Sequence, residues 1–183
     1  MMSRNRDVPI HAIWLAQDDP KKNTAVKLSK RGTIRLHEKF TKLPRRGIIL
    51  EPLCGKVLGP EDHSTLLEDG GALVGLDCSW AQIDDSVQQV MRRTRLKARM
   101  LPLLLAANPV NWGKPSKLST AEALAASLYL IGNEEQARDL MSAFNWGEQF
   151  FVLNREPLEA YKNAKSSKEL VDLQFDFFNI ERE

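Results

Sequence analysis

The order of elements in this sequence predicts an α/β fold with a mostly parallel sheet, followed by an all-helical region. Short apolar runs typical of buried strands alternate with amphipathic stretches between residues 10 and 107. From Ser119 onward only helical patterns occur. We therefore place a domain boundary near residue 109 and expect an α/β domain over residues 1–108 and a helical domain over residues 109–183.

The α/β half has four candidate strands and three candidate helices. The strands are short apolar runs, the last of them uninterrupted as in a strand covered on both faces: Ile10–Leu15, Ile48–Leu50, Ala72–Leu76 and Leu101–Ala107. Asp18-Asp19-Pro20 has the composition of a helix start. The expected helices are Asn23–Arg31, Pro60–Glu68 and Asp84–Lys97.

The C-terminal part contains four expected helices. Ser119-Thr120-Ala121-Glu122 matches a capping box, in which the first and fourth residues bond each other's backbone N–H groups. The expected helices are Ala123–Ile131, Glu134–Phe144, Leu153–Lys162 and Ser166–Phe178.

The charge is distributed unevenly along the chain. The 183 residues carry a net charge of +2, but residues 1–50 contain twelve Lys and Arg against four Asp and Glu. A basic cluster is often only a solvated face. Two clusters that flank one pocket instead favour a nucleic-acid partner, and we expect that arrangement here. The first cluster includes Lys21, Lys22, Lys27, Arg31, Arg45 and Arg46, and the second includes Arg92, Arg93, Arg95, Lys97 and Arg99.

Several functional classes lack support in the sequence. No run of about 18 apolar residues predicts a membrane span, and the polar start of the chain does not resemble a signal peptide. The two cysteines, Cys54 and Cys78, and the three histidines lack metal-ligand spacing. Phosphate-binding and hydrolase motifs are also missing. We expect a cytoplasmic protein without a metal site.

Two segments that follow predicted strands are candidate binding loops, because ligands of open parallel sheets bind at the carboxyl ends of the strands. The first is Leu76-Asp77-Cys78-Ser79-Trp80, and the second is the Asn- and Pro-rich segment 106–115. Each also has a structural interpretation. Asp77 or Ser79 can cap a helix, Trp80 can belong to the core, and the Asn side chains can bond their own loop.

These segments together resemble one family, the archaeal and eukaryotic small-subunit ribosomal RNA aminocarboxypropyltransferases. The resemblance extends over roughly residues 10 to 178. The segments Asp77-Cys78-Ser79-Trp80 and Ala106-Ala107-Asn108-Pro109-Val110-Asn111 are its most specific parts. Further matching pieces are Asp19-Pro20-Lys21-Lys22, Leu50-Glu51-Pro52, Arg99-Met100-Leu101-Pro102, Lys117-Leu118-Ser119 and Phe144-Asn145-Trp146-Gly147.

The resemblance implies a SPOUT-like α/β domain, knotted at the cofactor site, and a helical C-terminal domain. It implies that S-adenosylmethionine donates its 3-amino-3-carboxypropyl group to N3 of a pseudouridine, N1-methylated in eukaryotes, in small-subunit rRNA. The alternatives are an RNA methyltransferase on the same fold and a non-enzymatic ribosome assembly factor. We expect a monomer, because the helical domain can cover the surface through which many SPOUT proteins dimerise.

The resemblance also implies roles for individual residues. Thr24 and the backbone amide of Thr120 hold the carboxylate of the transferred group, and the carbonyl of Leu76 meets the ribose. Backbone groups of Leu101 and Ser116 read the adenine edge. The faces of the adenine pack against Leu50, Pro52, Trp80, Leu118 and Ala123. For the general base we propose Asp77, and for the RNA backbone the first basic cluster.

Overall fold

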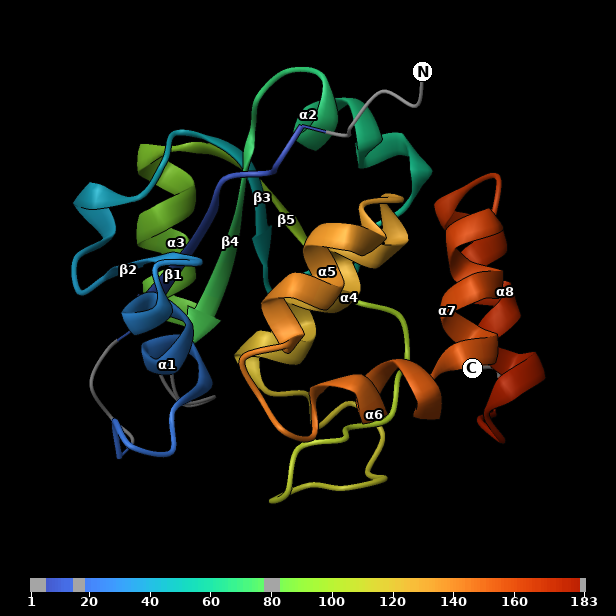
Figure 1. Ribbon diagram of the computed structural model, residues 1–183. Coiled ribbons are helices and arrows are strands. Elements are labelled where there is room, and N and C mark those ends of the chain that lie inside the picture. The colour runs from blue at the N-terminus through green and yellow to red at the C-terminus, as the bar shows by residue number, and fades with distance from the viewer. Residues whose placement is uncertain (1–5, 15–18, 78–82, 182–183) are drawn as a thin grey trace.

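The computed structural model describes residues 6–14, 19–77 and 83–181, and its centre is a five-stranded sheet (Figure 1). The strand order is β2-β1-β4-β3-β5, and all neighbouring pairs are parallel. The strands are β1 (Ile10–Trp14), β2 (Arg35–His37), β3 (Arg46–Leu50), β4 (Ala72–Asp77) and β5 (Arg95–Arg99). The prediction of an α/β fold with a parallel sheet is confirmed.

Helices cover both faces of the sheet, and the described chain after residue 119 is helical apart from its connections (Figure 1). The 3₁₀ turns are η1 (Phe40–Lys42) and η2 (Pro60–Asp62). The α-helices are α1 (Thr24–Arg31), α2 (His63–Leu67), α3 (Ile83–Arg93), α4 (Thr120–Leu130), α5 (Glu134–Met141), α6 (Gly147–Leu153), α7 (Arg155–Asn163) and α8 (Ser167–Phe177). None of the helices in the described ranges is long and apolar enough to cross a bilayer.

Alternation along the strands divides the core between the two sheet faces. On β3, Ile48 and Leu50 join a large cluster that continues into α1, α4, α5 and α7, whereas Ile49 joins a small cluster with Val90 of α3. The sheet and the C-terminal helices thus share one continuous apolar core.

Helix α4 is the central helix of this core, and nine of its eleven residues are buried. Gly75 of β4 permits its close approach, because a Cβ built on Gly75 would lie 3.1 Å from the Thr120 Cγ2 atom. The N-terminus of α4 is therefore held directly against the carboxyl end of β4.

The predicted strand over residues 101–107 is wrong. This segment is extended but forms only one isolated bridge, between Leu105 and Pro115. Side chains of the C-terminal helices replace a neighbouring strand. Asn154 accepts from the Leu105 N–H (2.7 Å) and donates to the Leu105 carbonyl (2.8 Å), and Gln174 accepts from the Leu103 N–H (2.7 Å). These bonds satisfy the backbone that a second strand would have paired.

Helix α3 ends earlier than predicted, and β5 (Arg95–Arg99) begins within the stretch, up to Lys97, that we had assigned to the helix. Thr94 marks the break: its hydroxyl donates to the Val90 carbonyl (2.8 Å) and accepts from the Leu96 N–H (3.3 Å). In this way one β-branched side chain both caps the helix end and starts the strand.

Three other boundaries differ from the predictions. Helix α1 begins at Thr24 with Asn23 as its N-cap, and the Asp19–Lys22 segment is a turn instead of a helix start. Helix α6 begins at Gly147, in the stretch that we had left as a connection between the predicted helices Glu134–Phe144 and Leu153–Lys162. Strand β2 was not predicted, because its three residues are too few to show alternation.

A pair of stacked histidine rings joins β1 to β2, with His11 Nδ1 lying 2.8 Å from His37 Nε2. Burial lowers the pKa of His11 to about 4, and the neighbouring His37 and Arg35 add to this effect. The pKa of a histidine in an unfolded chain is about 6.5. Between pH 6.5 and about 4, His11 is therefore protonated in the unfolded chain but stays neutral in the folded one.

We therefore expect the stability contributed by His11 to be present above pH 6.5 and to be lost as the pH falls from 6.5 towards about 4. Urea unfolding at several pH values should show that the native protein loses stability more steeply than His11→Gln over this window. Parallel stability curves for the two proteins would contradict this prediction.

Candidate functional site

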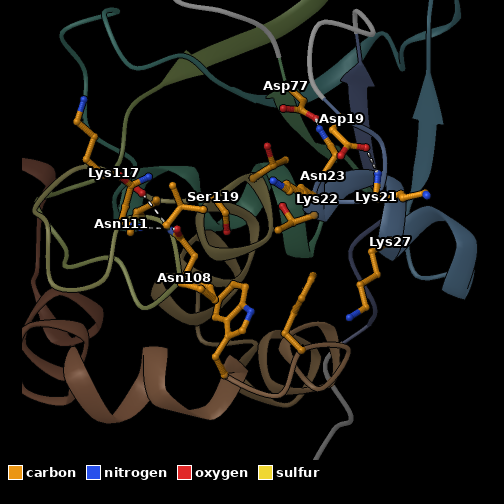
Figure 2. Close-up of a pocket in the computed structure, with 17 residues that line it drawn as sticks. Asp19, Lys21, Lys22, Asn23, Lys27, Asp77, Asn108, Asn111, Lys117 and Ser119 are labelled. Atoms are coloured by element: carbon orange, nitrogen blue, oxygen red, sulfur yellow. Dashed lines mark hydrogen bonds between the residues drawn. The ribbon is translucent and has the colours of Figure 1, made fainter.

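A polar pocket of about 640 Å³ lies at the carboxyl ends of β1 and β4 (Figure 2). One wall comes from the turn before α1 and the start of that helix, and the facing wall from residues 108–120. The polar pocket is lined by Asp19, Lys21, Lys22, Asn23, Thr24, Lys27, Asp77, Asn108, Pro109, Val110, Asn111, Lys117, Leu118, Ser119, Thr120, Phe144 and Trp146. Its place at the carboxyl edge agrees with the binding loops expected from the sequence.

The N-termini of two helices meet in this pocket. The Thr24 hydroxyl, in the first turn of α1, accepts a hydrogen bond from the Ala121 N–H of α4 at 3.2 Å. The positive ends of both helix dipoles and their first amide groups therefore point into the same space. Such a junction favours a carboxylate or phosphate more strongly than either helix end alone.

Asp77, the last residue of β4, faces this junction (Figure 2). Its carboxylate accepts a hydrogen bond from the side-chain amide of Asn23. The oxygen of the same Asn23 side chain accepts from the Val26 N–H at 3.0 Å and so caps α1. Asp77 thus fixes the residue that caps α1, while its carboxylate also borders the pocket.

An apolar pocket of about 230 Å³ adjoins the polar one, and Leu118 lines both. Its walls come from the segment after β3, the extended segment after β5, and α4. They are formed by Leu50, Glu51, Pro52, Leu53, Arg99, Met100, Leu101, Pro102, Ser116, Leu118 and Ala123. A flat apolar group with polar edges fits such a site. The buried ion pair of Arg99 with Asp62 (2.9 Å) stabilises one of its walls.

The buried carboxylate of Glu122 fixes the loop that separates the two pockets. One oxygen accepts from the N–H groups of Ala107 (2.6 Å) and Asn108 (3.0 Å), and the other from the Asn108 side chain and the Ser119 N–H (both 2.7 Å). The Asn108 side chain also accepts from the Asn111 N–H at 3.0 Å. The alternative given in the sequence analysis, that an Asn side chain bonds its own loop, therefore holds for Asn108. Glu122 has no exposed surface.

Two aromatic side chains close the floor of the polar pocket. Phe144 and Trp146 pack with their ring centres 4.9 Å apart, and the Lys27 ammonium group lies 5.0 Å from the centre of the Phe144 ring. The sequence analysis gave neither aromatic residue a role. Only their place in the segment Phe144-Asn145-Trp146-Gly147 could have indicated one.

Most of the predicted cofactor residues are brought together by the fold. Thr24 and Thr120 line the polar pocket, and the apolar pocket contains Leu50, Pro52, Leu101, Ser116, Leu118 and Ala123. The side chain of Leu76 packs into the small core cluster on the other face of the sheet. Trp80 lies outside the described residues.

The predicted RNA-contacting residues divide into two groups. Lys21, Lys22 and Lys27 line the polar pocket, whereas the exposed Arg31 lies 3.7 Å from Asp139. Arg45 and Arg46 lie near the start of β3, at the opposite edge of the sheet. The expectation that both basic clusters flank one pocket is therefore wrong, because each cluster is divided between the two ends of the strands: Arg45 and Arg46 of the first lie with Arg92, Arg93 and Arg95 of the second.

Within the described ranges, no group of three or more potential metal ligands occurs. The fold and the pockets define an α/β protein with a candidate site for a small, partly anionic ligand at the carboxyl edge of a parallel sheet. Comparison with known proteins specifies this class further.

The family described as "Ribosome biogenesis protein, C-terminal" matches residues 48–178. The 16S rRNA aminocarboxypropyltransferases of Methanosarcina mazei and Methanosarcina acetivorans are 43 % and 44 % identical over 172 residues. These alignments cover 94 % of this chain and 96 % and 95 % of the relatives.

A solved structure, that of the SAM-dependent rRNA:acp-transferase Tsr3 from Vulcanisaeta distributa, superimposes with a TM-score of 0.76 at 34 % identity. It covers 94 % of this chain and 98 % of its own. The chain belongs to the family of 16S rRNA aminocarboxypropyltransferases.

The geometry around Glu122 generates a stability prediction. In Glu122→Gln one carboxylate oxygen becomes an NH₂ group that faces N–H donors, so at least one buried donor loses its acceptor. We expect the free energy of unfolding to fall by about 3 kcal/mol. Urea denaturation measures this change. The exposed Glu135 of α5 provides the matched control, Glu135→Gln, and equal effects of the two substitutions would contradict the prediction.

Proposed function

We propose that this protein transfers the 3-amino-3-carboxypropyl group of S-adenosylmethionine to N3 of a pseudouridine, or N1-methylpseudouridine, in small-subunit rRNA. One observation carries the proposal. The apolar pocket and the polar pocket adjoin each other, with Leu118 lining both. The relatives of this chain are named for the proposed transfer.

The two pockets fit the two ends of S-adenosylmethionine. The leucine and proline side chains of the apolar pocket suit the faces of adenine, and backbone groups of Leu101 and Ser116 suit its polar edge. The junction of the α1 and α4 N-termini at Thr24 and Thr120 suits the α-carboxylate. We assign the ribose to the Leu76 carbonyl and the methyl group to the vicinity of Trp80.

When bound, S-adenosylmethionine supplies a sulfonium-activated carbon. The protein selects which of the three carbons reacts by placing one within about 3–3.5 Å of the acceptor. Transfer forms a bond between N3 and the aminocarboxypropyl carbon and breaks the carbon–sulfur bond, which releases methylthioadenosine. Asp77 accepts the N3 proton, and Asn23 holds its carboxylate in place.

The lysines of the polar pocket contact the RNA backbone near the modified nucleotide. Lys21, Lys22 and Lys27 line the pocket, and Arg31 lies on the same helix as Lys27. Such contacts position the RNA without reading its sequence.

The proposal also includes the remaining expectations from the sequence. The loop carrying the site belongs to a SPOUT-type knot, the boundary between the two domains lies at residues 108 and 109, and the protein acts as a monomer in the cytoplasm. The parallel sheet and the C-terminal helices are compatible with this description.

Product analysis tests the reaction. The protein is incubated with small-subunit rRNA from a strain that lacks the enzyme and with S-adenosylmethionine labelled in its carboxyl carbon. We expect label in the RNA and release of methylthioadenosine. Release of S-adenosylhomocysteine with unlabelled RNA would indicate a methyltransferase, and RNA binding without any binding of S-adenosylmethionine would indicate an assembly factor.

Asp77→Asn separates the general base from its structural role. The variant keeps an oxygen that can accept from Asn23 but removes the basic carboxylate. We expect transfer to fall by about 10²- to 10⁴-fold, with the affinity for S-adenosylmethionine measured by calorimetry nearly unchanged. Full transfer by Asp77→Asn together with weak binding by Asp77→Ala would assign Asp77 to holding α1 instead.

A further inference from the structure

A basic groove lies at the amino-terminal ends of β3 and β5, away from both the polar and the apolar pocket. It has a volume of about 540 Å³ and is lined by Arg45, Arg46, Arg92, Arg93, Thr94 and Arg95. We call it the arginine groove. Its walls come from the start of β3, the end of α3 and the start of β5. A backbone hydrogen bond from the Arg95 N–H to the Arg45 carbonyl (2.6 Å) holds two of these segments together.

The five arginines of this groove have exposed side chains, and the ion pairs of the described residues include none of them. Asp69 lines an adjoining cavity of about 170 Å³ together with Arg46, Arg95 and Lys97. Among the described residues, five arginines and no acidic side chain line the groove itself, which leaves a strong local positive charge.

A structural explanation accounts for only part of this cluster. Arg92 and Arg93 lie in the last turn of α3, where cations interact favourably with the helix dipole. Arg45, Arg46 and Arg95 belong to strands or the residues before them, so this effect does not reach them. Mutual repulsion in the groove is unfavourable unless a polyanion neutralises it.

The composition of the groove indicates which anion it binds. Its cations are all arginine, whose planar fork of donors bonds phosphate oxygens two at a time. An open groove built from three elements matches a row of phosphates better than a single small anion. Among the described residues no aromatic side chain lines the groove, so these residues provide contacts to a backbone but no platform for bases.

The arginine groove is too far from the apolar pocket, which adjoins the polar pocket, for one nucleotide to occupy both. The strand β3 runs from Arg46 at the groove to Leu50 at the apolar pocket, a rise of about 13 Å at 3.3 Å per residue. An RNA that contacts both the arginine groove and the pockets must therefore extend along the full length of the strands.

We propose that the arginine groove binds the sugar–phosphate backbone of the rRNA at a second place, remote from the modified nucleotide. This inference rests on the proposed function, because it takes the substrate to be rRNA. The inference implies that the protein recognises the folded rRNA around the modified nucleotide. A short RNA fragment would then contact only the lysines of the polar pocket.

The test uses two RNAs and matched neutralising variants. The RNAs are a complete small-subunit rRNA transcript and the shortest transcript that is still modified. Arg92→Gln/Arg93→Gln and Arg45→Gln/Arg46→Gln each remove two charges, the second without altering a helix. The control, Lys165→Gln/Lys168→Gln, removes two exposed charges near the start of α8.

We expect each groove variant to weaken binding of the complete transcript by about tenfold at low salt and to reduce the salt slope by about 1.5. Binding of the short transcript and of S-adenosylmethionine should not change. Lys21→Gln/Lys22→Gln should weaken binding of both RNAs. Groove variants that behave like the control on the complete transcript would overturn the inference.

The two proposals fail in distinguishable ways. If no methylthioadenosine is released but the groove variants lose affinity for the complete transcript, the groove is an RNA site on a protein with another activity. If transfer is confirmed and the groove variants bind and modify the complete transcript like the native protein, only the groove inference fails. Urea unfolding of each variant verifies that the fold is intact.

Discussion

The buried carboxylate of Glu122 is the constraint on which both pockets depend. A fully buried charge is tolerated only when donors surround it, and here four N–H groups do so. These donors come from the extended segment before the loop, from the loop itself, and from the capping residue of α4. One side chain thereby fixes the wall shared by the two pockets to α4, the helix whose N-terminus lines the polar pocket.

The parallel sheet explains why the ligand groups gather at one edge. Parallel strands place all their carboxyl ends together, so Leu50 and Asp77 lie on the same side of the molecule although 26 positions separate them in the sequence. The same polarity places the starts of β3 and β5 together at the other edge, with their arginines. The two functional faces proposed for this protein thus follow from the single direction of its strands.

The sequence predicted the buried strands and the capped helices well, because their signals are local. Asn23 and Ser119 begin α1 and α4, and the apolar run of β4 marks a strand covered on both faces. The run at 101–107 carries the same apolar signal. It is not a strand of the sheet, because Asn154 and Gln174 from distant helices and the backbone of residues 113–116 satisfy its N–H and carbonyl groups. No local pattern contains that information.

The candidate site, like the fold, could be predicted only where its residues carry a local signal or a family motif. Local reasoning predicted the candidate binding loops around Asp77 and Asn108, and the family resemblance supplied Thr24, Thr120 and the apolar wall. The pairing of Asn23 with Asp77 and the packing of Phe144 on Trp146 escaped both, because each joins residues whose chemistry is also that of an ordinary cap or core. The placement of Arg46 of the first basic cluster beside Arg95 of the second could be known only from the strand register.

The hydrogen bonds of Asn154 have a consequence for the evolution and engineering of this fold. The helices from α6 onward contribute no side chain to either pocket, yet Asn154 at the α6–α7 junction holds the backbone at Leu105, two residues from a donor to Glu122. The helices from α6 to α8 therefore brace a site whose walls are formed by other parts of the chain. A minimal protein cut back to the sheet and α4 would keep most of the residues that line the two pockets and lose the scaffold that aligns them.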